Sequence, residues 1–247
     1  MSGTDILRVP PWHCEQGGDR CLVVVFEAHD PECSNRFAVE LARRIVAAGM
    51  PQVRDVVPSM AAVGVHFEPA SARDAVVRRV QALMPARLAR EETDVREIEL
   101  PVCYGGEHGR DLDDVARHCG LDRDEVIALH SASRVRVLML GFAPGHPYLG
   151  MFDARLSIGR RTTPRTAVPQ GSIGLANRQC VIYPVVLPAG WNLIGRIPLR
   201  LFDPLRASPC LLDVGDYVRF RAIGPEEFEH IAREQGPAIR PAATPAG

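Results

Sequence analysis

The chain contains no lysine, because all 29 of its basic residues are arginine. This absence excludes a catalytic Schiff base, a biotinylated lysine and the lysine of a phosphate-binding P-loop. Any anion that the protein binds must be held by arginine, by backbone N–H groups or by helix ends. The bias itself also fits the codon usage of a GC-rich genome.

Aromatic residues make up only 6% of the chain, and its net charge is −1. Neither value favours nucleic acid or an anionic membrane surface as a partner. No apolar run approaches the roughly 18 residues of a membrane-spanning helix. The first residues also lack the basic start and apolar core of a signal peptide. We therefore expect a cytoplasmic protein.

The seven cysteines include no C-x-x-C pair and show no zinc-site spacing. Their odd number and the expected cytoplasmic location favour reduced thiols over disulfides, and no structural metal is expected. The motifs G-x-S-x-G, H-E-x-x-H and Walker A are also missing. No catalytic residue can therefore be assigned from a motif.

The first part of the chain has the pattern of a small α/β domain. Its hydrophobic periods predict the order βαββαβ, which is typical of two helices covering one face of an antiparallel sheet. We predict strands at 20–26, 53–57, 61–67 and 95–102, and helices at 33–49 and 71–90. Ser34 or Asn35 and Ser71 are the expected N-caps, and a bend is expected at Pro58 and Ser59.

The pattern changes after Cys103. Two short helices are expected, with Asp111 and Asp122 as N-caps and Gly120 at the end of the first. Beyond 134, short apolar stretches separated by proline and glycine predict a β-barrel or sandwich, followed by one amphipathic helix. We divide this α+β chain into a polar lead-in at 1–17, an α/β domain at 18–92, a β-barrel domain at 93–235 and a disordered tail at 236–247.

Several polar residues outside known motifs could carry chemistry. The acidic stretch that begins at Asp111 could hold a divalent metal, although acids at a helix start are more often cap and dipole partners. His118 and His130 lie on predicted helices beside apolar residues, so we expect them to be structural. His108 and His146 lie in glycine loops, where we expect exposed side chains that are free to act.

The densest polar signal is the segment 160–166, which holds three arginines and three threonines. It could form a cradle for an anion, and the alternative is a solvated basic loop. Polar and aromatic side chains that are costly to bury follow it on predicted strands, and a β-barrel presenting them around one opening would form a polar cleft. These residues are Gln179, Tyr183, Trp191, Asn192 and Arg196.

Five longer blocks of the sequence carry a family resemblance. They are, in this order, LPVCYGGEHGRDLDDVARHCGL, VIALHS, VLMLGFAPGHPYLG, RRTTPRTAVPQGSIGLANRQCVIYP and AGWNLIGRIPLRLFDP. Together they resemble the allophanate hydrolase subunit 1 family, which includes the B subunit of 5-oxoprolinase (PxpB) and the kinase inhibitor KipI. The resemblance implies a small α/β domain followed by a cyclophilin-like β-barrel.

The resemblance also implies an activity and partners. In the ATP-dependent 5-oxoprolinase, the B and C subunits activate the lactam with ATP, and ring opening is completed by a separate A subunit. We therefore expect ATP with Mg²⁺ to be bound by the complex, in which this chain or its partner contacts it, and we expect the chain to be inactive alone. The expected partners are the C subunit, a second cyclophilin-like protein of the allophanate hydrolase subunit 2 family, and the A subunit, of the LamB/YcsF family. The alternatives are a KipI-like inhibitor of a sensor histidine kinase and an accessory carboxyltransferase of a urea-carboxylase-like system.

The polar residues described above and the resemblance together give the candidate site residues. The candidates for contact with substrate or ATP are, in order of preference, Arg161, Arg165, Gln179, Arg196, His146, Tyr148, Glu107 and His108. The loop GFAPGHPYLG at 141–150 is expected to form a backbone wall of the cleft through Gly141, Pro144 and Gly145. His146, Met151 and Ala189 depart from the family pattern, in which Phe, Gly and Gly are usual. These departures bear on the substrate rather than on the fold.

Overall fold

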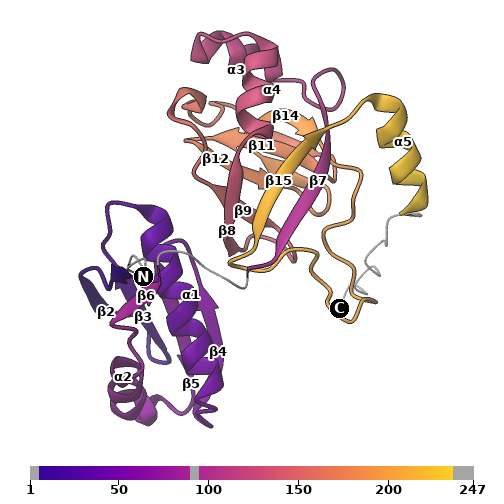
Figure 1. Cartoon of the computed structure of the whole chain (residues 1–247). Helices are drawn as coiled ribbons and strands as arrows, with labels where there is room; N and C mark the ends of the chain where they lie inside the picture. Colours follow the sequence, from indigo (N-terminus) through magenta and orange to yellow (C-terminus); the bar gives the residue numbers. More distant parts are fainter. Residues whose placement is uncertain (1–5, 90–94, 236–247) are drawn as a thin grey trace, which may run out of the picture. The chain divides into compact units, whose positions relative to one another are not determined.

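The structure is a computed structural model that describes residues 6–89 and 95–235. Contacts between residues divide the chain into two units. The first comprises 1–96 with the short segments 136–139 and 214–216, and the second comprises the remaining residues. Figure 1 shows the helices and strands of both units coloured along the sequence.

A four-stranded antiparallel sheet is the centre of the first unit. Its strands follow the order β2-β3-β5-β4, and β1 pairs with β6 in a separate two-stranded sheet. The elements of this unit are β1 (Ile6–Arg8), β2 (Trp12–Gln16), β3 (Cys21–Phe26), α1 (Pro31–Ala47), β4 (Val53–Pro58), β5 (Ala62–Phe67), the 3₁₀ turn η1 (Ala70–Ala72), α2 (Arg73–Ala82) and β6 (Arg87–Ala89).

Alternating burial along β3 and β5 explains how the two helices cover this sheet. Val24 and Phe26 of β3 face the same core as Phe37 and Leu41 of α1 and Val80 of α2. A strand points every second side chain to one face, and a helix presents one apolar stripe every three to four residues. The predicted order of strands and helices is therefore confirmed from β3 to α2.

The last strand of this series differs from the prediction. The strand expected at 95–102 exists as β7 but pairs with β14 and β15, so β6 is the strand that follows α2. The structure also places β2 within 1–17, the stretch expected to be a polar lead-in. A local pattern predicts a strand but not its partner, because the partner is selected by distant residues. The tail predicted at 236–247 lies outside the described residues.

The helix starts of the first unit also differ from the prediction. Asp30, rather than Ser34 or Asn35, caps α1, and its side chain accepts a hydrogen bond from the backbone of Glu32. Ser71 lies within η1, and α2 begins without a side-chain cap. Pro31 at the first helical position moves the start of α1 upstream, because its fixed φ suits the first turn.

A closed β-barrel is the centre of the second unit, which confirms the predicted α+β class with a β-barrel. Its strand order is β11-β12-β9-β8-β15-β7-β14, and β14 pairs with β11 to close it. β15 and β7 are parallel to each other. The elements are β7 (Glu97–Tyr104), α3 (Leu112–Cys119), α4 (Arg123–Ser131), β8 (Arg134–Leu140), β9 (Pro147–Gly150), η2 (Ala154–Leu156), β10 (Arg165–Val168), β11 (Ser172–Ala176), β12 (Gln179–Ile182), β13 (Leu187–Ala189), β14 (Asn192–Arg196), β15 (Tyr217–Ala222) and α5 (Pro225–Glu234).

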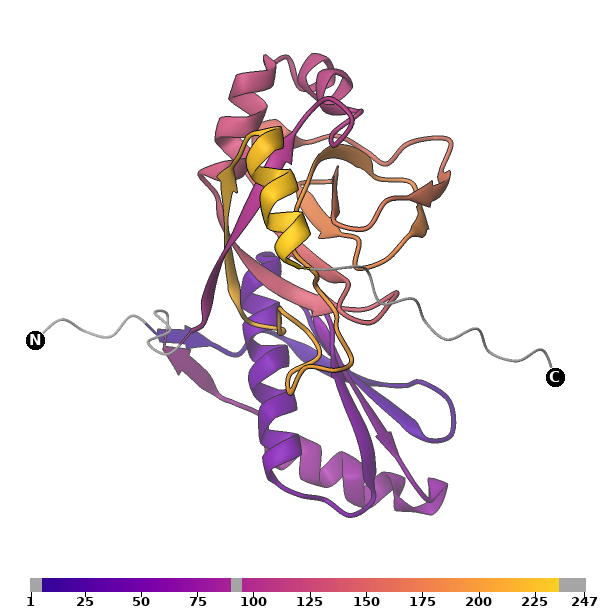
Figure 2. The same ribbon diagram turned by 90° about the vertical axis from the view of Figure 1, so that its right-hand side faces the viewer.

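Three helices lie around this barrel. α3 contacts β14, α4 contacts β15 and α5 contacts β7, and Figure 2 shows α5 running beside the barrel strands. The predicted cap of α4 is confirmed, because Asp122 and Glu125 form a reciprocal capping box. The predicted end of α3 is confirmed by Gly120, whose φ of +67° suits glycine.

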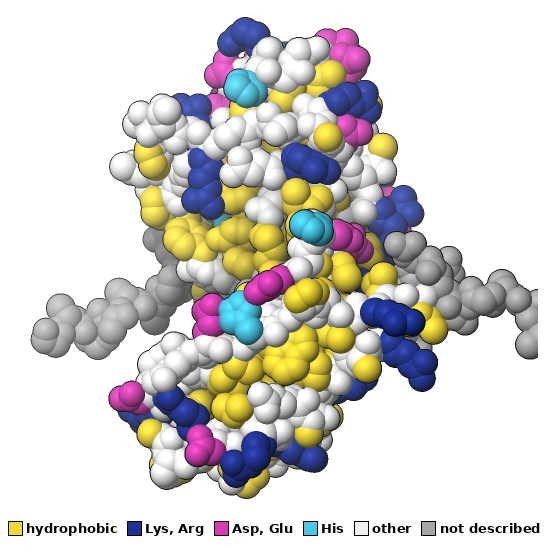
Figure 3. Space-filling view, turned by 90° about the vertical axis from the view of Figure 1, so that its left-hand side faces the viewer, with side chains coloured by type: hydrophobic (Ala, Val, Ile, Leu, Met, Phe, Trp, Pro, Cys, Tyr) yellow, Lys and Arg dark blue, Asp and Glu magenta, His cyan; other side chains and the backbone are white. Residues whose placement is uncertain are grey.

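None of the helices that the structure describes is long and apolar enough to cross a membrane. Figure 3 shows one face of the molecule, on which basic and acidic side chains are interspersed with apolar ones. This mixed surface agrees with the net charge of −1.

Candidate functional site

Asp111 connects two of the predicted arginines. Its Oδ1 accepts hydrogen bonds from Nη1 of Arg161 at 3.0 Å and from Nη2 of Arg165 at 2.7 Å. Its Oδ2 accepts from the backbone N–H of Leu193 at 2.7 Å, and its side chain is only 4% exposed. The expectation that its side chain caps α3 is wrong, because Asp111 stands at the N-cap without making a cap hydrogen bond. The only hint in the sequence that Asp111 pairs with arginines was the arginine-rich segment some fifty residues later.

The arginine-rich segment is held next to β13. The backbone N–H of Arg161 donates to the carbonyl of Gly190 at 2.7 Å, and Arg165 in β10 is opposite Ala189. Nε of Arg161 and Nη1 of Arg165 are buried and have no hydrogen-bond partner within 6–89 and 95–235, although the two side chains remain 32% and 24% exposed. Two guanidinium groups therefore share one carboxylate, and the excess positive charge favours an anion.

Asn192 fixes the start of this segment. Its Nδ2 donates to the carbonyl of Gly159 at 2.8 Å and to that of Leu175 in β11 at 3.0 Å. A buried amide that joins two backbone carbonyls in this way holds a loop in one position. Asn192 is thus a positioning residue for the arginines that follow Gly159.

Four rings form a continuous set beside these arginines. The ring centroid of His146 lies 5.1 Å from that of Tyr148 and 5.2 Å from that of Tyr183, and the centroid of Tyr148 lies 6.2 Å from that of Trp191. Arg160 places its guanidinium carbon 4.9 Å from the centroid of Trp191, a cation–π distance. His146, Tyr183 and Trp191 are buried, so Tyr148 is the ring of this set that keeps partly exposed apolar surface near the positive charge of Arg160.

Electrostatics connects the rings to the arginines. Burial raises the pKa of the Tyr183 hydroxyl above its ordinary value, and the positive charges of Arg160 and Arg165 oppose this rise. Tyr183 is therefore neutral at pH 7 and can act as a hydrogen-bond donor. The contact between Arg160 and Trp191 places the rings beside the arginine-rich segment.

His146 is buried, with 2% of its surface exposed, so the expectation of an exposed loop histidine is wrong. Neither ring nitrogen has a hydrogen-bond partner among the described residues. Burial lowers the pKa of His146 to about 4, so the ring is neutral at pH 7. A neutral imidazole offers one N–H donor and one acceptor, and both remain unused here.

The loop at 141–150 turns back on itself and thereby buries this histidine. The backbone N–H of Gly141 donates to the carbonyl of His146, and the N–H of His146 donates to the carbonyl of Ala143. Gly145 has a φ of +70°, and a Cβ at this position would lie 2.9 Å from Cβ of Phe202. The turn and the close approach both require glycine. The role of Gly141, Pro144 and Gly145 as a wall of a substrate cleft stays a prediction.

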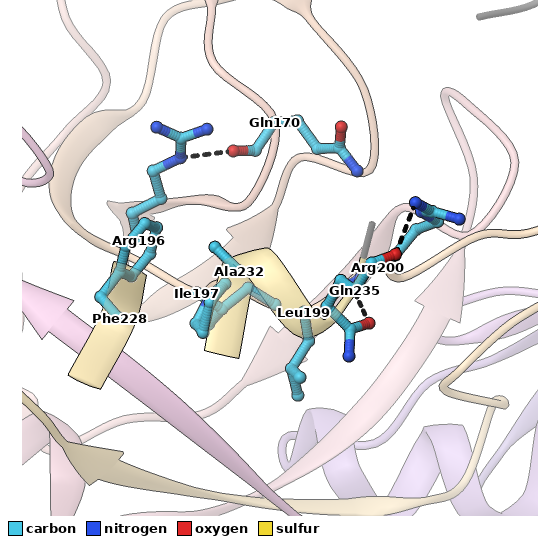
Figure 4. A pocket seen from close by; sticks show the side chains of 9 residues that line it. Gln170, Arg196, Ile197, Leu199, Arg200, Phe228, Ala232 and Gln235 are labelled. Atoms are coloured by element: carbon cyan, nitrogen blue, oxygen red, sulfur yellow. Dashed lines mark hydrogen bonds between the residues drawn. The ribbon is translucent and has the colours of Figure 1, made fainter. Parts of the chain in front are cut away.

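Arg196 lies at the other end of β14 from Asn192, about 13 Å along the strand. Its Nε donates to the carbonyl of Gln170 at 2.7 Å, as Figure 4 shows. The ring of Phe228 in α5 contacts both Arg196 and His108, with its centroid 5.6 Å from the guanidinium carbon and 4.3 Å from the imidazole centroid. Burial and the charge of Arg196 lower the pKa of His108. Arg196 and His108, two of the predicted site residues, thus meet at a second location around the ring of Phe228. Phe228 was not predicted as a site residue, and the sequence indicated only that it lies on an amphipathic helix.

Two further candidates lie away from the arginine pair. Gln179 begins β12, opposite Gly150 of β9 and Ala176 of β11, whereas Tyr183 follows the far end of the same strand. About 13 Å along the strand separates these two residues. Glu107 is exposed in the turn before α3, where its charge acts on the neighbouring His108. The structure therefore divides the predicted site residues among several places on the barrel.

Comparison with known proteins gives matches over most of the chain. The family described as carboxyltransferase domain, subdomain C and D, matches residues 12–212. The 5-oxoprolinase B subunit of Bacillus subtilis is 34% identical over 235 residues, which cover 91% of this chain and 98% of that protein. The protein of the same name from Escherichia coli is 41% identical over 208 residues, which cover 84% of this chain and 94% of that protein.

A solved structure agrees with these sequence matches. The crystal structure of TTHA0988 has a TM-score of 0.74 and 35% identity to this chain. The match covers 83% of this chain but 40% of the TTHA0988 chain, so the similarity concerns one part of that larger protein. The sequence matches and the shared fold agree, and the chain therefore belongs to the family of 5-oxoprolinase B subunits.

Proposed function

We propose that this chain is the B subunit of an ATP-dependent 5-oxoprolinase-type complex, which activates a cyclic amide such as 5-oxoproline for ring opening. Two relatives that are named as B subunits of 5-oxoprolinase, matched over 98% and 94% of their lengths, support this role. The chain would act with a C subunit, the second cyclophilin-like protein, and with an A subunit. Alone it would have little activity.

The sharing of Asp111 between Arg161 and Arg165 is the observation that carries the proposal. One carboxylate neutralises one of the two guanidinium groups, so the pair keeps an excess positive charge. Four rings run in contact from His146 to Trp191, and Arg160, the residue before Arg161, lies over the ring of Trp191. A small flat ring that gains negative charge during a reaction is complementary to both features.

The chemistry explains why such a site is needed. An amide carbonyl is a poor electrophile, and transfer of a phosphoryl group to its oxygen creates a leaving group. Arg161 and Arg165 would stabilise the negative charge that develops on this oxygen, while Tyr148 and Trp191 would orient the ring. ATP would supply the phosphoryl group. Mg²⁺ would enter bound to the phosphates of ATP, because this ion is usually held largely by substrate phosphates and water.

The test is ATP hydrolysis by the chain mixed with its cognate C and A subunits, with and without 5-oxoproline. We expect hydrolysis that depends on 5-oxoproline and falls at least tenfold in Arg165→Ala, because this variant removes one of the two guanidinium groups. The matched control is Arg155→Ala, which removes an exposed arginine that pairs with Asp153. An intact complex whose ATP hydrolysis ignores 5-oxoproline would overturn the proposed substrate. Equal losses in both variants would overturn the role of the arginine pair.

A further inference from the structure

A pocket of about 170 Å³ lies in the second unit, at the end of β14 opposite the arginine pair. It is formed by the turn before β11, the segment that follows β14, and one face of α5, as Figure 4 shows. The residues that line it are Gln170, Arg196, Ile197, Pro198, Leu199, Arg200, Phe228, Ala232 and Gln235. None of these nine described residues is acidic, and five of them are apolar. The pocket is smaller than those that hold drug-sized molecules, so its ligand must be small.

Arg196 gives this pocket an uncompensated positive charge. The side chain is half-buried, and its Nε donates to the carbonyl of Gln170. Among the described residues Arg196 forms no ion pair, and burial lowers the pKa of its guanidinium, an effect that the charge of Glu229 opposes. A cation that is partly removed from water without a paired anion is destabilised, and an anionic ligand would remove this cost.

The described side chains in contact with Arg196 carry no negative charge that could take the place of an anionic ligand. Phe228 covers one side of the guanidinium, and His108 lies against the same ring. Because burial and the charge of Arg196 lower the pKa of His108, this imidazole is neutral at pH 7. Arg200, the other arginine of the pocket, is already paired with Asp203 at 3.1 Å. Arg196 is thus the group at which an anion would bind.

The backbone on the Gln170 side of the pocket is fixed before any ligand binds. Gly171 donates its N–H to the carbonyl of Tyr183 at 2.7 Å, and its carbonyl accepts from the N–H of Ile197 at 2.9 Å. Its φ is +81°, and a Cβ there would lie 2.3 Å from the carbonyl oxygen of Ile197. The carbonyl that orients Arg196 is therefore held rigidly, and a preorganised site loses little entropy on binding.

We propose that this pocket binds a small organic carboxylate with an apolar body. The carboxylate pairs with the terminal nitrogens of Arg196, and the apolar part lies against Leu199, Phe228 and Ala232. A single guanidinium matches the two oxygens of one carboxylate, whereas a phosphate dianion requires more donors than these walls provide. The site is separate from the pair at Asp111, and the proposal does not depend on the function proposed above.

The test is an NMR titration of the full chain with three probes, namely isovalerate, its uncharged amide isovaleramide, and inorganic phosphate. We expect saturable shifts at the pocket with isovalerate, and at least tenfold weaker binding of isovaleramide and of phosphate. Arg196→Gln should weaken isovalerate binding at least tenfold. Arg233→Gln, which changes an arginine in the last turn of α5 outside the pocket lining, should leave it unchanged.

A second variant keeps the result independent of any folding defect in Arg196→Gln. Ala232→Leu fills the pocket from α5 and leaves Arg196 intact, so it should also weaken isovalerate binding at least tenfold. Thermal unfolding of each variant establishes that it is folded. Equal binding of isovalerate and isovaleramide, preference for phosphate, or unchanged binding in folded Ala232→Leu would each overturn the proposal.

Discussion

Arg165 and Asp111 lie 54 residues apart in the sequence and form a 2.7 Å hydrogen bond between Nη2 and Oδ1. Asp111 stands at the start of α3, and Arg165 begins β10. Arg161 donates to the same carboxylate oxygen, and Leu193 to the other. This one buried carboxylate therefore joins α3, β14 and the arginine-rich segment, and it has both a structural and an electrostatic consequence.

Asp111→Asn should destabilise the protein by about 2–3 kcal/mol. The substitution leaves two guanidinium groups without their counter-charge, and loss of one partner from a buried pair costs about 3–5 kcal/mol. The arginines are about a quarter to a third exposed, so solvent screening reduces this value. Urea denaturation measures the change. Asp114→Asn is the control, because Asp114 pairs with Arg117 on the exposed face of α3 and should cost less than about 0.5 kcal/mol; a similar loss in both variants contradicts the argument.

Protonation of His146 should lower the free energy of unfolding as the pH falls. Its pKa is about 4 in the folded protein, below the ordinary value of 6.5, because the ring is buried. Between these values the unfolded chain binds a proton that the folded chain does not, so the stability is complete above pH 6.5 and is lost as the pH falls toward 4. We expect His146 to account for a loss of about 2 kcal/mol between pH 7 and pH 5. His130, whose pKa burial lowers to about 3, adds a loss in the same range.

His146→Phe tests this assignment by denaturation at pH 7, 6 and 5. The variant should lose about 2 kcal/mol less than the parent protein between pH 7 and pH 5. At pH 7 it should be at least as stable, because carbon replaces two buried ring nitrogens that have no hydrogen bond to any residue that the structure describes. His118→Gln, at an exposed position of α3, should keep the pH dependence of the parent. Identical pH dependence in His146→Phe and the parent would show that His146 does not carry this effect.

Local features of the fold were predictable from the sequence. The capping box at Asp122, the helix end at Gly120 and the hairpin that bends after Pro58 depend on residues within a few positions of one another. Their physical causes are hydrogen bonds and backbone conformations of neighbouring residues. The same locality explains why the strand at 95–102 was predicted while its barrel partners were not.

The candidate site was predictable in composition but not in arrangement. The sequence indicated that Arg161, Arg165 and Arg196 bind anions, but the structure places the first two on Asp111 and the third beside Phe228. These contacts join segments separated by 32 to 54 residues. Hydrophobic periodicity describes only neighbouring residues, so it could not predict these contacts. A similar limit applies to His146. Its loop composition favoured exposure, whereas packing of the loop on the barrel buries it.

Gly171→Ala should destabilise the protein by about 3 kcal/mol. The residue has a φ of +81°, and its new Cβ would lie 2.3 Å from the carbonyl oxygen of Ile197. Backbone strain of this kind costs about 1–3 kcal/mol, and the clash adds to it. Gly159→Ala is the matched control, because its φ is not positive and nothing lies within 4 Å of its Cβ position. Thermal unfolding compares the two, and equal melting temperatures would contradict the close approach of this turn to Ile197.

Arg165→Lys separates charge from geometry in the proposed reaction. Lysine keeps the positive charge beside Asp111 but loses the planar pair of donors, one of which, Nη1, has no hydrogen-bond partner among the described residues. If that donor geometry stabilises the activated amide, ATP hydrolysis that depends on 5-oxoproline should fall about 10- to 100-fold, which corresponds to about 1.4–2.8 kcal/mol. Stability in urea should change by less than about 1 kcal/mol, because the ion pair with Asp111 is retained. Arg155→Lys is the control at an exposed pair and should leave both quantities unchanged. Full activity in Arg165→Lys would mean that charge alone is sufficient, and a loss of stability as large as in Asp111→Asn would assign Arg165 to the fold instead.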